Sequence, residues 1–208
     1  MHILKINSLS FKNKIFYKDM EIEDGKIVFI RGSSGSGKST LLRLINATLP
    51  IEEGTIYYTD KDIRDMDTIS LRREIILAGQ SVYLFPGTIK DNFIKYHEYR
   101  ESKTPTDEEI SFYLKLCCLD FDIDAICDNF SGGEKQRVFL SLALSFKPKV
   151  LLLDEPTSAL DSYTSNELMN NLVGYCKEQG ITTLIVSHDH EITEKYAEVK
   201  IDIGGGNK

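Results

Sequence analysis

The stretch Arg31-Gly32-Ser33-Ser34-Gly35-Ser36-Gly37-Lys38-Ser39-Thr40 decides the fold class of this chain. It follows the apolar run 27–30 and precedes the apolar run 41–45, so the local order is strand, loop, helix. That order is the context that a phosphate-binding P-loop requires. Glycines let the backbone approach phosphate oxygens closely, so that successive N–H groups and the start of a helix point at one anion. We therefore predict a nucleotide site; the alternative is a Gly/Ser-rich surface turn.

Two side chains at the end of this loop indicate what the nucleotide contacts. Lys38 supplies a mobile positive charge for the β and γ phosphates, and the hydroxyl of Ser39 suits Mg²⁺. The loop residues that we predict to bind the nucleotide are Gly32, Ser33, Ser34, Gly35, Ser36, Gly37, Lys38, Ser39 and Thr40.

Composition limits the class of protein. The sequence has 208 residues, of which 41% are hydrophobic and 27% charged, and this length suits one α/β domain with at most a small inserted lobe. The formal net charge of −7 argues against nucleic acid as a partner, because phosphate binding needs clustered Lys and Arg. No apolar run approaches the roughly 18–20 residues that span a bilayer. We expect a cytoplasmic protein, so any membrane step needs another chain.

Three further apolar runs end in polar side chains that suit a ligand site. They end, in order, at Gln80, at the pair Asp154 and Glu155, and at His188. The run 150–153 is apolar throughout, as in a strand that is buried on both faces. Because the carboxyl ends of parallel strands share one edge of a sheet, we expect these side chains close to the P-loop.

The segment 88–128 differs in character from the rest. Apolar residues recur there at helical spacing, a capping box fits Thr106 to Glu109, and no strand-like run is present. We predict a mostly helical lobe over 88–128. It is inserted into a catalytic core that consists of 1–87 and 129–208, and the whole chain is one domain.

Two more motifs complete a family pattern. The stretch 129–137, Asn-Phe-Ser-Gly-Gly-Glu-Lys-Gln-Arg, looks like the ABC signature, and 151–161, Leu-Leu-Leu-Asp-Glu-Pro-Thr-Ser-Ala-Leu-Asp, looks like a Walker B strand joined to a D-loop. With the P-loop, Gln80 and His188 in this order, the chain resembles the nucleotide-binding subunits of ATP-binding-cassette (ABC) transporters over nearly its whole length. The resemblance implies an α/β fold: a P-loop NTPase core with a mostly parallel sheet, an N-terminal antiparallel β portion and an inserted α-helical subdomain.

The resemblance also implies how ATP is held and hydrolysed. Asp154 would join Ser39 in the Mg²⁺ shell, which Gln80 would also touch. Glu155 would orient and deprotonate the attacking water, and His188 would contact that water and the γ-phosphate. The catalytic residues implied in this way are Glu155, His188, Gln80 and Lys38.

A second copy of the chain is the first partner that the resemblance implies. Two subunits would pair head to tail, so that Ser131 and Gly133 of one face the γ-phosphate bound at Lys38 of the other. Asp161 and Ser158 would couple the two sites across this homodimer. The residues of the signature and D-loop assigned to the nucleotide are Ser131, Gly132, Gly133, Glu134 and Asp161.

An aromatic side chain is expected to stack on adenine, as aromatics do on any base face. Phe11 aligns best with the stacking residue of the family, two positions before Asn13-Lys14, whereas Phe16 and Tyr17 fall where the family has apolar strand residues. Each of these rings could instead pack in a small sheet. We predict that Phe11 stacks on the base.

The second partner implied is a transmembrane permease. We predict an ATPase subunit that drives transport and lies on the inner face of the cell membrane through that permease. The stretch 80–92 has an exporter-like pattern, and the chain is similar to small stand-alone bacterial ATPase subunits of the iron-exporter type, so metal or iron export is an expected cargo. The presence of both Glu155 and His188 argues for hydrolysis rather than for a scaffold without turnover.

One alternative is a non-transport ABC ATPase that acts on DNA or the ribosome. The DNA-acting kinds insert long coiled coils between P-loop and signature, whereas only residues 81–130 separate Gln80 from Ser131. The ribosome-acting kind usually carries two cassettes, which 208 residues cannot hold. Transport is therefore the favoured function.

Overall fold

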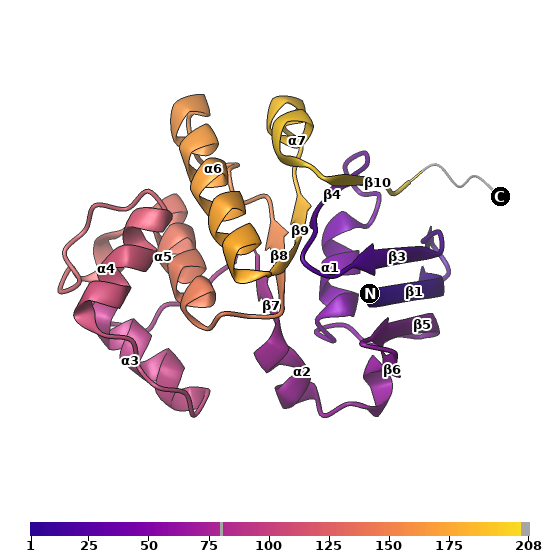
Figure 1. The fold of residues 1–208 in the computed structure, drawn as a ribbon, viewed down its shortest axis with the longest axis horizontal. Helices are drawn as coiled ribbons and strands as arrows, with labels where there is room; N and C mark the ends of the chain where they lie inside the picture. The colour runs from indigo at the N-terminus through magenta and orange to yellow at the C-terminus, as the bar shows by residue number, and fades with distance from the viewer. Residues whose placement is uncertain (80, 205–208) are drawn as a thin grey trace.

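The computed structural model describes residues 1–79 and 81–204 (Figure 1). An antiparallel sheet lies at one end of the molecule, a parallel sheet in the middle and a group of helices at the other end. The strands of the antiparallel sheet are β1 (His2–Phe11), β2 (Ile15–Phe16), β3 (Met20–Glu23), β5 (Glu53–Tyr58) and β6 (Lys61–Asp62).

The parallel sheet carries the edge at which the predicted site residues meet. Its strands lie in the order β10 (Val199–Asp202), β4 (Ile27–Arg31), β9 (Thr182–Val186), β8 (Val150–Asp154) and β7 (Ile75–Ala78). All neighbouring pairs in it are parallel. The loops that follow β4, β8 and β9 therefore start from adjacent positions on one edge.

Strand β4 shows why these strands are apolar at every position. Ile27 and Phe29 pack into the core on one face of the sheet, and Val28 and Ile30 pack into the core on the other face. Successive side chains of a strand alternate between faces, so a strand covered on both sides needs apolar residues throughout. Strand β8 divides its side chains between the same two cores.

Helices cover both faces of the parallel sheet. The helices of the described chain are α1 (Lys38–Ile45), α2 (Thr68–Glu74), α3 (Ile89–Tyr99), α4 (Asp107–Leu116), α5 (Gly132–Ser145), α6 (Ser162–Gln179) and α7 (His190–Tyr196), with 3₁₀ turns η1 (Ile63–Asp65) and η2 (Cys127–Asn129). Helix α1 lies between the two sheets and shares one core with β1 and β5, whereas α5 and α6 share the other core (Figure 1). None of the helices described combines the length and apolar character needed to cross a bilayer.

The segment 88–128 holds α3, α4 and the first two residues of η2, and no regular strand is present in it. Its two ends meet in an isolated antiparallel bridge between Thr88 and Ile126. The capping box predicted at the start of α4 is confirmed, because Glu109 Oε2 accepts the N–H of Thr106 at 2.8 Å while Thr106 Oγ1 accepts the N–H of Glu109 at 3.3 Å. Helix α4 also packs against α5, so the lobe and the signature helix form one helical group.

Candidate active site

The P-loop joins β4 to α1 and is packed tightly against neighbouring backbone. A Cβ atom on Gly32 would lie 2.1 Å from the carbonyl oxygen of Ile203, so only glycine fits there. Gly37 caps α1 in the left-handed region, at φ +97°. The ammonium of Lys38 folds back over the loop and donates to the carbonyl oxygens of Gly32 at 2.8 Å and Ser33 at 3.0 Å. The loop is thus preformed by its own lysine, in the strand–loop–helix context predicted from the sequence.

Ser39 and Asp154 bring two hard oxygen ligands together. The Ser39 hydroxyl donates to Asp154 Oδ1 at 2.9 Å, although 115 positions separate the two residues. Asp154 ends β8 and its side chain is buried. A carboxylate and a hydroxyl oxygen next to a phosphate-binding loop are the donors that Mg²⁺ takes in nucleotide sites, so these residues fit the ion.

Glu155 and His188 meet across the ends of β8 and β9. Their side chains approach to 3.1 Å, between Glu155 Oε1 and His188 Nε2. Glu155 has φ +54° and its N–H donates to the carbonyl of Val186 at 3.0 Å, so the next strand holds its backbone in a conformation that side chains rarely adopt. Such stored strain is typical of functional positions.

One hollow unites the residues predicted from separate motifs. It has a volume of about 210 Å³ and lies over the P-loop. Its lining residues are Ile15, Ser34, Gly35, Gly37, Lys38, Ser39, Thr40, Glu155 and His188. The phosphate-binding loop, the metal-binding hydroxyl and the acid–histidine pair therefore face the same space, as hydrolysis of a bound nucleotide requires.

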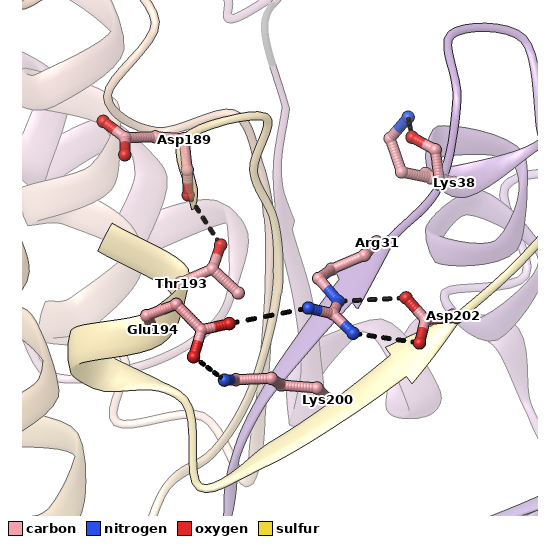
Figure 2. Close-up of polar contacts among 8 residues, drawn as sticks. Arg31, Lys38, Asp189, Thr193, Glu194, Lys200 and Asp202 are labelled. Carbon is pink, nitrogen blue, oxygen red and sulfur yellow. Dashed lines mark hydrogen bonds and ion pairs between the residues drawn. The ribbon is translucent and has the colours of Figure 1, made fainter. Parts of the chain in front are cut away.

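An ionic network fastens the start of the P-loop to the helix after His188 (Figure 2). Arg31 donates two hydrogen bonds, each 2.9 Å long, to the carboxylate of Asp202 in β10, and lies 3.6 Å from Glu194 in α7. Lys200 also pairs with Glu194, and that hydrogen bond is the main cause that lowers the pKa of Glu194. Helix α7 is capped by Asp189, next to His188. The network therefore links β4, which precedes the P-loop, to the helix that begins two residues after His188.

The signature residues form the start of α5. Ser131 caps the helix: its hydroxyl oxygen accepts the N–H of Glu134 at 3.3 Å, while Glu134 Oε2 accepts the N–H of Ser131 at 2.8 Å. These bonds hold the pKa of Glu134 below its usual value. A Cβ on Gly133 would lie 3.1 Å from Ala159 in the D-loop, whereas a Cβ on Gly132 would meet nothing within 4 Å. Gly133 thus lies against the D-loop, and Gly132 faces open space.

The D-loop lies between the signature and the hollow. Asp161 caps α6, since its Oδ1 accepts the N–H groups of Tyr163 and Thr164, and its hydrogen bonds to Thr164 lower its pKa. Ser158 lines a second hollow, of about 230 Å³, which Glu155 and His188 also line. The role of Asp161 and Ser158 in coupling two sites stays a prediction.

The aromatic residue predicted to stack on adenine does not line the hollow. Phe11 ends β1, where it pairs with Ile15 of β2, and the ammonium of Lys12 lies 5.3 Å from its ring centre. Ile15, rather than Phe11, lines the hollow over the P-loop. Stacking of Phe11 on adenine therefore stays a prediction. Gln80 lies outside the described residues, as does the end of the chain from residue 205.

Three residues around the P-loop have no role in the predictions made from the sequence. Ile15 lines the hollow but has the sequence pattern of an ordinary strand residue. Asp202, which pairs with Arg31, lies 171 positions away in the sequence. Tyr17 stands where the family has apolar residues, and its hydroxyl, at a position expected to be buried, is the one local signal of its hydrogen bond to the Gly37 carbonyl.

The fold and the hollow define a class. The site lies at one edge of a parallel sheet in an α/β fold. A P-loop follows one strand, a buried aspartate and a glutamate follow a second, and a histidine follows a third. This arrangement defines a P-loop nucleoside triphosphatase.

Comparison with known proteins gives the family. The family model described as ABC transporter matches residues 18–158. The ABC transporter I family member 17 of Arabidopsis thaliana is 39% identical over 181 residues, which cover 86% of this chain and 68% of that protein. This chain therefore belongs to the ABC transporter family, and the described part is its ATP-binding domain.

Two solved structures share the fold. One is cbiO1 from Clostridium perfringens, described as part of the ABC transporter complex cbiONQ, with a TM-score of 0.80 at 30% identity. The match covers 97% of this chain and 84% of the cbiO1 chain. The other is the ATP-binding cassette MJ0796, described as a dimer in a post-hydrolysis state with ADP and Pi, with a TM-score of 0.80 at 28% identity. The match covers 96% of this chain and 94% of the MJ0796 chain. The predicted α/β fold class is confirmed.

The relatives are diverse in what their names say they transport. At 34–36% identity they include a methionine import ATP-binding protein of Clostridium tetani, an Fe(3+) ions import ATP-binding protein of Fusobacterium nucleatum and a mitochondrial iron-sulfur clusters transporter of Gibberella zeae. The chain spans between 52% and 68% of the length of the first three curated relatives.

Proposed function

We propose that this chain hydrolyses ATP as one half of a head-to-tail dimer and thereby drives transport through a separate membrane subunit. The observation that carries the proposal is the hollow of about 210 Å³ that Lys38, Ser39, Glu155 and His188 line together. A phosphate cradle alone would bind a nucleotide, whereas the acid–histidine pair beside it supplies the groups for attack by water.

Each side chain has a role that follows from its position. Lys38 would leave the loop carbonyls and bind the β and γ phosphates, where its charge offsets theirs. Glu155, held by Val186 and paired with His188, would orient the attacking water and take its proton. Ser39 and Asp154 would hold Mg²⁺, which neutralises charge on the phosphate oxygens.

The second copy would complete the nucleotide site with the exposed start of its helix α5. Ser131 fixes the start of a 14-residue helix, whose positive end favours an anion, and Gly132 next to it leaves space for close approach. A γ-phosphate held on the P-loop of another copy suits that end. The dimeric relative that holds ADP and Pi supports this arrangement.

The membrane partner and the cargo stay proposals. The similarity to a component of a transporter complex supports a transmembrane permease as partner, with the chain at the cytoplasmic face of the membrane. The iron-exporter type receives no support from relatives whose names include methionine and Fe(3+) import. We propose instead that the membrane subunit selects the cargo. The net charge of −7 argues against nucleic acid as a partner.

The test is the Glu155→Gln variant. Glutamine keeps the size of the side chain but cannot take a proton, so the variant should bind MgATP, fail to hydrolyse it and accumulate as a dimer. Size-exclusion chromatography with light scattering should show the mass double from 23.6 kDa in millimolar MgATP. The double variant Glu155→Gln/Lys38→Ala should stay monomeric. A monomeric single variant, with a wild type that hydrolyses no ATP beside its permease, would overturn the proposal.

A further inference from the structure

Tyr17 lies directly beneath the P-loop, outside the hollow that the nucleotide would fill. It follows β2, and its own N–H donates to the carbonyl of Leu9 in β1 at 2.9 Å, so the antiparallel sheet holds its backbone. Only 5% of the residue is exposed. Its hydroxyl donates to the carbonyl oxygen of Gly37 at 2.9 Å. Burial raises the pKa of Tyr17, so the hydroxyl keeps its proton and remains a donor.

The Gly37 carbonyl is fixed from two sides. Besides the Tyr17 hydroxyl it accepts the N–H of Leu41 at 2.8 Å, the first hydrogen bond of α1. The peptide between Gly37 and Lys38 is planar and trans, so its N–H points opposite to its carbonyl. Fixing the carbonyl toward Tyr17 therefore fixes the Lys38 N–H toward the outer side of the helix start. An anion binds on that side.

The contact leaves little room for adjustment. Gly37 has φ +97°, and a Cβ on it would lie 2.8 Å from the Tyr17 oxygen and 2.6 Å from Cγ2 of Ile15. The glycine thus lies on a floor that these two side chains make. Glycine alone would let this peptide rotate, but the close side chains of Tyr17 and Ile15 restrict that rotation.

We propose that Tyr17 is a positioning residue for nucleotide binding, whose hydroxyl holds the Gly37–Lys38 peptide with its N–H aimed at a phosphate. The proposal rests on the proposed ATP site, and it adds a residue that never touches the ligand. The ligand group concerned is a phosphate shared by nucleoside di- and triphosphates, because the backbone N–H groups of a P-loop cradle the α and β phosphates.

Tyr17→Phe is the test, since it removes the hydroxyl and keeps the ring. Calorimetry should show the affinity for MgATP and for MgADP falling by the same factor, roughly fivefold, as for the loss of one hydrogen bond. In steady-state hydrolysis KM for ATP should rise while kcat stays within about twofold, because the residue acts on binding.

Tyr58→Phe is the matched control. Tyr58 is 2% exposed, belongs to the same core, and its hydroxyl donates to Glu74 at 2.5 Å, away from the P-loop. Urea denaturation should show both variants losing stability, but only Tyr17→Phe losing nucleotide affinity. If Tyr17→Phe does not fold, Tyr17→Met fills the space with an apolar chain and carries the same prediction.

The outcomes separate this inference from the proposed function. If the wild type binds MgATP and the Tyr17 variants bind it equally well, the hydroxyl is a structural group and the inference is wrong, while the ATPase proposal stands. Equal losses of affinity in the Tyr17 and Tyr58 variants also overturn it. A wild type that binds no nucleotide overturns both.

Discussion

The P-loop side and the signature side of the molecule are built in opposite ways. Around the P-loop, polar groups bond to partners from distant parts of the chain: Ser39 to Asp154 across 115 positions, and Arg31 to Asp202 across 171. At the signature, Ser131 and Glu134 bond to each other, and Gly132 faces open space. The first region is assembled by the tertiary fold, whereas the second is one helix start presented outward.

The two constructions match the different tasks of the two regions. A phosphate cradle must hold several groups within tenths of an ångström, so it is supported from several elements. A helix start that a second copy approaches needs only its own cap and an unobstructed surface. Substitutions at the P-loop should therefore affect the isolated chain, and those at the signature should affect the pair of chains.

The largest effect should come from Lys38→Ala. The variant loses the buried ammonium that the loop holds for phosphate, so MgATP affinity should fall by roughly 100-fold or more, measured by calorimetry. Circular dichroism should show the fold intact. Lys135→Ala, which removes an exposed ammonium bound to the Asp128 carbonyl beside the signature, should leave the affinity of the monomer unchanged. Undiminished affinity in Lys38→Ala would contradict the assignment of the loop.

Ser131→Ala should act at the signature and not at the P-loop. Removing the cap of α5 should cost about 1 kcal/mol in the free energy of unfolding. MgATP affinity of the monomer should be unchanged, whereas ATP hydrolysis and dimer formation should fall together. Thr106→Ala, which removes the equivalent cap of α4, is the control: it should lower stability alike and leave hydrolysis unchanged. Weaker nucleotide binding by monomeric Ser131→Ala would contradict the claim that the signature acts only in the pair of chains.

Arg31→Gln should have a smaller effect, because exposed ion pairs contribute little in water. We expect kcat to fall roughly twofold to fivefold, since α7 and the adjacent His188 lose their link to β4. The difference from the wild type should shrink at 1 M salt, where the ion pairs are screened. Arg31→Lys should recover only part of the rate, because lysine cannot donate in parallel to both oxygens of Asp202. A salt-independent difference would argue against an ionic link.

The smallest effect concerns His97, which joins the lobe to the signature helix. Its ring nitrogens lie 2.9 Å from the hydroxyls of Ser145 and Ser102, and burial, followed by the charge of Arg100, lowers its pKa below the ordinary 6.5. As pH falls below about 6.5, the unfolded chain takes up a proton here before the folded chain does, so stability falls. His97→Gln should reduce that slope in urea denaturation between pH 7 and 5. An unchanged dependence of stability on pH would contradict the assignment of this dependence to His97.

Local patterns in the sequence predicted most of the architecture. The apolar runs of β4, β8 and β9, the P-loop between β4 and α1, and the capping box at Thr106 depend on neighbours a few residues away, and the structure has them. The edge that gathers Glu155 and His188 followed from one general rule, that parallel strands end together.

The remainder depends on contacts that no local pattern contains. That Tyr17 lies under Gly37, or that Arg31 reaches Asp202, follows only once two sheets and a C-terminal strand are packed together. Gly133 lies against Ala159 of the D-loop, a contact that its sequence neighbours do not indicate, and its approach to a phosphate bound by a second copy stays a prediction. Motifs in the sequence indicate which residues serve the site, whereas the packing of distant segments determines what each of them contacts.

The position of β4 in its sheet has a consequence for how the protein is made. β4 pairs with β9 on one side and with β10 on the other, and hydrogen bonds between these regions span 157 and 171 positions. During translation at roughly 5–20 residues per second, the strand before the P-loop therefore waits on the order of 10 s for both neighbours. Until then it has two unpaired edges, which favour aggregation. We expect a nascent chain to gain nucleotide binding among its last properties, and a chaperone to matter most in that interval.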